Sequence, residues 1–129
     1  MRIIGMVFLV FLFCGCTSIN GIKNSQGSGV SRMYERSFDE AYDAALKAIR
    51  HLEGFTIIEE DRGKGEIIAV RSMNMSVASS GERVALFLSR LNEQETKIEV
   101  VSKAIVVTQI FAPHWENQIF QLIDLQLEK

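Results

Sequence analysis

Hydrophobic and polar positions follow a helical period between residues 38 and 53. The apolar side chains there share one helical stripe, formed by Phe38, Ala41, Tyr42, Ala45, Ile49 and Leu52. Ser37, followed three positions later by Glu40, forms a capping box, and Gly54 is a typical helix stop. Acidic side chains gather in the first half and basic ones in the second, which matches the helix dipole. The pattern predicts an amphipathic helix over residues 38–53.

Shorter stretches around this helix have the alternation typical of strands. Residues 30–36 predict a short edge strand. Residues 55–61 and 66–72 flank Arg62-Gly63-Lys64-Gly65, a connection of the length that joins two strands in a hairpin. We therefore expect an edge strand before the helix and a β-hairpin after it.

Two further strands are predicted later in the chain. Residues 83–91 are apolar at both parities, which favours a central strand covered on both faces. In residues 96–107 the two parities differ: one holds Ile98, Val100, Ala104 and Val106, and the other holds Lys97, Glu99 and Lys103. This second pattern predicts a strand with one solvated face.

A final helix is predicted over residues 114–127. Pro113 suits a helix start, where its missing N–H has no intrahelical partner. A narrow polar stripe runs along this helix, while Trp115, Ile119, Phe120, Leu122, Ile123, Leu125 and Leu127 cover most of the remainder. Either neighbouring elements cover this wide apolar arc, or part of it is a docking face. The order of elements predicts an α+β fold, with an antiparallel sheet of four to five strands and two helices packed on one face.

The beginning of the chain has a different character. Residues 3–13, IIGMVFLVFLF, have no polar side chain and follow Arg2. The run is shorter than the roughly 20 apolar residues that a membrane-spanning helix needs. A basic start followed by such a run is typical of a secretory signal peptide.

The chain has two cysteines, Cys14 and Cys16, directly after this run. A disulfide between positions i and i+2 has poor geometry, and a metal site needs more ligands than this segment offers. The stretch LFCGC resembles the lipobox of bacterial lipoproteins, because the small Gly15 precedes Cys16. Phe13 and Cys14 depart from the leucine and the smaller residue that are usual there.

The resemblance implies that residues 1–15 are a signal peptide and that Cys16 becomes the acylated first residue. Acyl chains such as palmitate would then attach the protein to the lipid bilayer. Residues 16–29 are interpreted as the lipidated cysteine and a flexible tether, because they are rich in Ser, Asn and Gly, and residues 30–129 as one α+β domain. In many lipoproteins of this kind, an aspartate directly after the acylated cysteine retains the protein at the inner membrane. This chain has Thr17 there, so the resemblance favours the outer membrane, facing the periplasm. The alternatives are an uncleaved N-terminal membrane anchor and a soluble secreted protein.

The whole chain resembles small bacterial lipoproteins of unassigned function that carry a single α+β domain behind a lipidated cysteine. A remoter likeness is to the helix-grip domains of lipoproteins that assist outer-membrane assembly. This likeness implies a scaffolding role in the cell envelope.

Composition narrows the chemistry further. The 129 residues are 47% hydrophobic and 23% charged, which suits one globular domain. Loss of Arg2 with the signal peptide changes the formal net charge from −2 to −3, and no basic stripe favours nucleic acid. The sequence has no GxSxG, P-loop, HExxH or GxGxxG motif. We expect no enzymatic activity, no cofactor and no metal.

The favoured function is a non-enzymatic binding or scaffolding module for another envelope protein. Candidate contact residues are Trp115, Phe120 and Leu125 on the final helix, and Met73 and Met75 beyond the hairpin. Contact could also use strand addition at the predicted edge strand. The alternative is a carrier of a small apolar ligand or lipid, in a pocket between sheet and helices that Phe87 and Met73 would line.

Overall fold

The computed structural model describes residues 18–71, 82–104 and 115–129. The predicted signal peptide, Cys16, Met73, Met75 and Pro113 lie outside these residues. In chain order the elements are α1 (Ser18–Lys23), β1 (Val30–Tyr34), α2 (Phe38–His51), β2 (Phe55–Asp61), β3 (Glu66–Arg71), β4 (Glu82–Asn92), β5 (Glu95–Ala104) and α3 (Glu116–Leu127).

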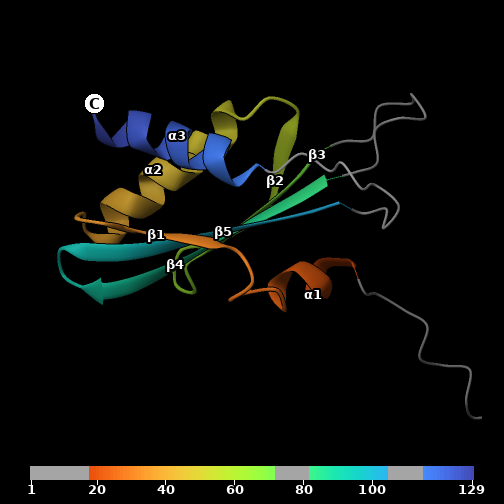
Figure 1. The fold of residues 1–129 in the computed structure, drawn as a ribbon, viewed down its shortest axis with the longest axis horizontal. Coiled ribbons are helices and arrows are strands. Elements are labelled where there is room, and N and C mark those ends of the chain that lie inside the picture. Colours follow the sequence, from red (N-terminus) through yellow and green to blue (C-terminus); the bar gives the residue numbers. More distant parts are fainter. Residues whose placement is uncertain (1–17, 72–81, 105–114) are drawn as a thin grey trace, which may run out of the picture.

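The strands form one antiparallel sheet in the order β1-β5-β4-β3-β2. Helices α2 and α3 lie together on one face, and α1 lies on the other (Figure 1). The predicted α+β class, antiparallel sheet and pair of helices on one face are confirmed. The central position of the strand predicted over residues 83–91 is also confirmed, because β4 pairs with both β3 and β5.

Local capping explains where α2 begins and how the hairpin meets it. The Ser37 hydroxyl accepts a hydrogen bond from the Glu40 N–H at 3.3 Å, as the capping box predicts. The hairpin turn lies close to the first turns of α2, where the Arg62 guanidinium donates to the carboxylates of Asp39 and Asp43. The predicted hairpin is therefore present and is tied to the helix beside it.

The hairpin turn also approaches β4 closely at Gly65. Its φ is +70°, and a Cβ built there would lie 2.2 Å from the Leu88 carbonyl oxygen. The Leu88 N–H donates to the Gly65 carbonyl at 2.7 Å. Glycine is required here because the positive φ and the close approach leave no room for a side chain.

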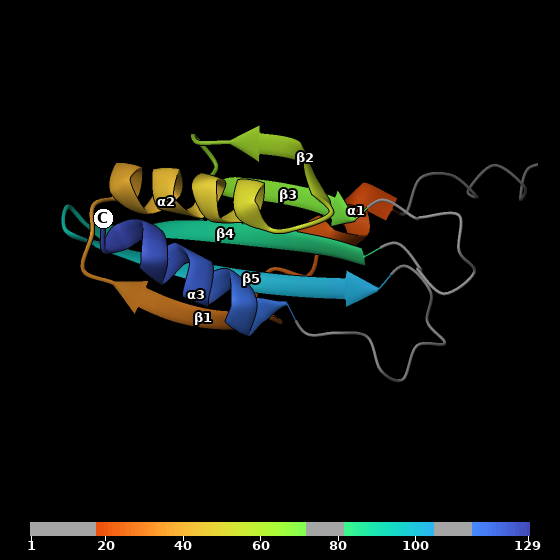
Figure 2. The same ribbon diagram turned by 90° about the horizontal axis from the view of Figure 1, so that it is seen from above.

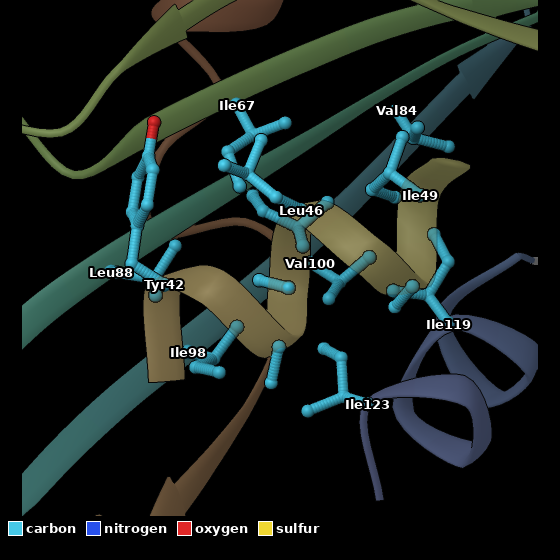
Figure 3. Packing of buried hydrophobic residues seen from close by; sticks show 14 of the residues in the cluster. Tyr42, Leu46, Ile49, Ile67, Val84, Leu88, Ile98, Val100, Ile119 and Ile123 are labelled. Atoms are coloured by element: carbon cyan, nitrogen blue, oxygen red, sulfur yellow. The ribbon is translucent and has the colours of Figure 1, made fainter. Parts of the chain in front are cut away.

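The main core fills the space between α2, α3 and the sheet. Figure 3 shows side chains from both helices and from β3, β4 and β5 converging there. Its large members are fully buried and include Tyr42, Ile49, Ile67, Leu86, Ile98, Ile119, Phe120 and Ile123. Burying each such side chain contributes about 1.5–3 kcal/mol, so this layer is the main source of stability.

The segment predicted to be a flexible tether is instead packed on the sheet. Ile22 of α1 is 2% exposed and completes a second apolar cluster with Ile68, Ala85, Phe87 and Val101. The Lys23 ammonium lies 2.7 Å from the Glu59 carboxylate on β2, and this hydrogen bond raises the pKa of Lys23. The tether prediction is therefore wrong for residues 18–29, which we call the N-terminal clasp.

A buried carboxylate holds the end of the clasp. Glu99 of β5 is 5% exposed, and its oxygens accept from the Gly27 N–H at 2.8 and 2.9 Å and from the Gly29 N–H at 3.0 Å. Gly29 lies so close to β5 that a Cβ would be 2.3 Å from the Val100 carbonyl oxygen. The predicted solvated face of this strand is thus wrong at Glu99 and at Val101, because the clasp covers both.

Candidate functional site

Strand β1 forms one edge of the described sheet, so one side of its backbone has no strand partner there. It pairs with β5 alone, in regular register from Val30 opposite Val100 to Tyr34 opposite Thr96. Four of its five residues are exposed, with Val30 at 46% and Met33 at 73%. A regular edge strand with exposed apolar side chains is a template for a further strand. We call Val30–Tyr34 the β1 edge.

Helix α3 holds the β1 edge in place from one face. The Arg32 guanidinium lies 4.5 Å from the centre of the Phe120 ring and 3.7 Å from the Asp124 carboxylate. Tyr34 packs against the main core, and burial, followed by the neighbouring Asp124 carboxylate, raises its pKa. Because side chains on this face are fixed, the strand is ordered before any partner arrives.

The opposite edge of the sheet, β2, is protected. Its pairing with β3 is interrupted by a bulge between Ile57 and Glu59. Glu59 is paired with Lys23, and the Glu60 carboxylate lies 3.9 Å from the Arg50 guanidinium. Bulges and charged side chains are the usual means by which an edge strand avoids pairing with another chain. Ile58 is 45% exposed, but it lies at the bulge, where the regular pairing breaks.

A shallow, open groove of about 380 Å³ adjoins the end of the β1 edge. The Arg36 guanidinium donates to the Leu127 carbonyl at 3.2 Å, which ties the chain after β1 to the end of α3. The groove is lined by Met33, Tyr34, Glu35, Arg36, Asp124, Leu127 and Glu128. This mixed lining suits the side chains of a peptide lying along β1 better than it suits an apolar small molecule.

The structure divides the predicted contact residues of the final helix. Phe120 is fully buried in the main core, so its assignment to a docking surface is wrong. The reason is that α2 and β5 both cover the apolar arc of α3. Leu125 is 54% exposed and accessible, but its neighbours Gln121 and Glu128 are polar, and single exposed leucines are common on protein surfaces.

Trp115 lies at the end of the sheet and contacts three residues, Glu82, Phe55 and Arg71. Its indole N–H donates to the Glu82 carboxylate at 2.7 Å, and its ring packs edge-on against Phe55 with 5.1 Å between centroids. The Arg71 guanidinium lies 5.3 Å from the centre of the indole and 3.5 Å from the same Glu82 oxygen. Trp115 therefore closes one end of the core, where β3 ends and β4 begins.

The described residues include no metal-binding group, and they place Phe87, a residue of the alternative carrier hypothesis, away from α2 and α3. In residues 18–71, 82–104 and 115–129, no group of three or more His, Cys, Asp or Glu side chains could hold a metal ion. The His51 imidazole Nδ1 lies 2.7 Å from the Lys47 carbonyl oxygen of its own helix. Phe87 faces α1, so it does not line a pocket between the sheet and α2 or α3.

In the segments that the structure describes, no helix is both long and apolar enough to cross a bilayer. No protein-family model matches the chain, and no curated protein matches it. The proposals below rest on two features of the structure. The β1 edge supports a binding role, and the N-terminal clasp supports an inference about the orientation of the domain.

Proposed function

We propose that the protein is an envelope lipoprotein, anchored through acylated Cys16, that binds another envelope protein without catalysing a reaction. The lipobox-like LFCGC stretch supports the anchor. The single observation that carries the binding role is the regular, exposed β1 edge, in contrast to the protected β2 edge on the opposite side of the sheet. We place the protein at the outer membrane, facing the periplasm.

Binding by strand addition explains why β1 is open. A partner strand would hydrogen-bond to the free backbone groups of β1, and its side chains would meet Met33 and the groove that Met33 lines together with the end of α3. The flexible thioether of Met33 adapts to different neighbours. Since α3 already orders this strand through Arg32 and Tyr34, little conformational entropy is lost on the lipoprotein's side.

Site-specific photo-crosslinking tests the binding role in the native membrane. A photoreactive residue at position 33 should capture one envelope protein, whereas the same residue at position 58, on the bulged β2 edge, should not. Met33→Lys should abolish recovery of this partner from mild detergent, and Ile58→Lys, which places the same charge at the other edge, should not. Equal crosslinking at both edges, or recovery unchanged by Met33→Lys, would refute the β1 edge as the binding surface.

The anchor is tested separately with a Cys16→Ser variant. Without the acyl chains, the protein should leave the membrane fraction and lose the mass of the lipid. If the variant keeps both its mass and its membrane association, the lipoprotein assignment is wrong. This experiment does not depend on the identity of any partner.

A further inference from the structure

Because the N-terminal clasp is packed on the sheet, the domain lies much closer to its proposed lipid anchor than it would behind a flexible tether. Only Thr17 separates Cys16 from α1, which begins at Ser18. Two residues of extended chain span at most about 7 Å. A free segment over residues 17–29 would instead reach about 45 Å, which would let the domain tumble away from the membrane.

The clasp is held firmly enough to keep this distance short. Ile22 is buried against the sheet, Lys23 is paired with Glu59, and the Glu99 carboxylate binds the backbone near its end. These contacts come from β2 and β5 and from the apolar cluster between them. The segment therefore moves with the domain.

Helix α1 lies at one end of the sheet. Figures 1 and 2 both place it where β3 and β5 end and β4 begins, which is the end marked by Arg71, Glu82 and Lys103. The β4–β5 turn and the C-terminus lie at the other end (Figure 2). We call the α1 end proximal and the other end distal.

We infer that the proximal end of the domain rests on the headgroups of the lipid bilayer, with the strands directed away from the membrane. The inference rests on the proposed acylation of Cys16. The occupant follows from the length of chain before α1, because an acyl anchor within about 7 Å of Ser18 keeps the start of α1, and with it the proximal end, close to the bilayer surface. Lys103, exposed near the end of β5, would then lie near the lipid phosphates, a favourable position for a cation.

Energy transfer from two positions on β5 and its turn tests this orientation. The predicted mature chain retains only Cys16, which is acylated, so an introduced cysteine gives a unique labelling site. The full-length protein carrying either Lys103→Cys or Gln94→Cys is reconstituted into phosphatidylethanolamine–phosphatidylglycerol vesicles that contain an acceptor-labelled headgroup. The strand between the two sites spans about 30 Å, so the donor at 103 should show strong transfer and the donor at 94 weak transfer.

A matched control lengthens the anchor without touching the domain. Insertion of about 15 Gly and Ser residues between Thr17 and Ser18 restores a flexible reach of roughly 20 Å and should remove the difference between the two donors. Equal transfer from both positions without the insertion would overturn the inference. A difference that survives the insertion would also overturn it, because the orientation would then come from surface attraction rather than from a short anchor.

Flotation and mass measurement on the same samples separate this inference from the proposed function. Protein that lacks the acyl mass and does not float with vesicles contradicts the lipoprotein assignment. Acylated, floating protein with equal transfer from positions 94 and 103 leaves that assignment intact and refutes the fixed orientation alone.

Discussion

Replacement of Phe120 by alanine distinguishes a core residue from a docking residue. Phe120 of α3 is fully buried in the main core, and the Arg32 guanidinium covers its ring. A buried Phe→Ala change costs about 3–5 kcal/mol, from lost transfer free energy and the cavity that remains. With a urea slope of about 2 kcal/mol per molar, the unfolding midpoint should fall by roughly 2 M.

The matched change on the same helix is Leu125→Ala, at a side chain that is 54% exposed. It should alter the free energy of unfolding by no more than about 0.5 kcal/mol. Trp115 is the single tryptophan and packs at the core's edge, so its fluorescence reports unfolding of the acyl-free chain beginning at Thr17. A cost below about 1 kcal/mol for Phe120→Ala, or equal costs at both positions, would show that Phe120 is not a core residue.

Three further predictions concern the clasp, the tyrosines and the hairpin turn. Glu99→Ala removes charge-assisted hydrogen bonds worth about 1.5–3 kcal/mol, so tryptic cleavage after Lys23 should accelerate at least about tenfold; an unchanged rate would argue against a docked clasp. Burial raises the pKa of both tyrosines, Tyr34 and Tyr42, above the ordinary value near 10. The unfolded chain therefore loses these protons first, stability falls as pH rises above about 10, and phenolate absorbance of the folded protein should appear at higher pH than that of the unfolded chain; phenolate formation in the folded protein near pH 10 would contradict this. Gly65→Ala should destabilise the protein by more than about 1 kcal/mol, measured by thermal unfolding, because its Cβ would meet a β4 carbonyl oxygen at a positive φ; an unchanged midpoint would contradict the close approach.

The sequence pattern was sufficient to predict those elements whose structure is determined by residues nearby in the chain. The α2 helix could be predicted because Ser37 and Glu40 cap it and its apolar stripe is regular. The β2–β3 hairpin and the central strand β4 followed from turn residues and from apolar positions at both parities. In each case the information lies within about 15 residues of the element it specifies.

The clasp was missed because its stabilising contacts are distant in sequence. A stretch rich in Ser, Asn and Gly has the composition of a linker, and its backbone N–H groups meet Glu99 across 70 to 72 residues. The available signal was Ile22, an apolar residue in a polar segment, together with a glutamate between apolar neighbours in β5. The outcome at Phe120 was equally non-local, because a wide apolar arc does not reveal how many neighbours cover it.

The asymmetry between the two edges of the sheet also limits growth of any assembly. Among the described strands, β1 is regular and open, whereas β2 is bulged and charged. If two copies joined β1 to β1 about a two-fold axis, each would present its protected β2 at the outside of the combined sheet. The pair would be closed, since no template strand would remain for a third molecule. Strand addition at β1 would therefore end with one neighbouring chain, and a fibre built by repeated strand addition is disfavoured.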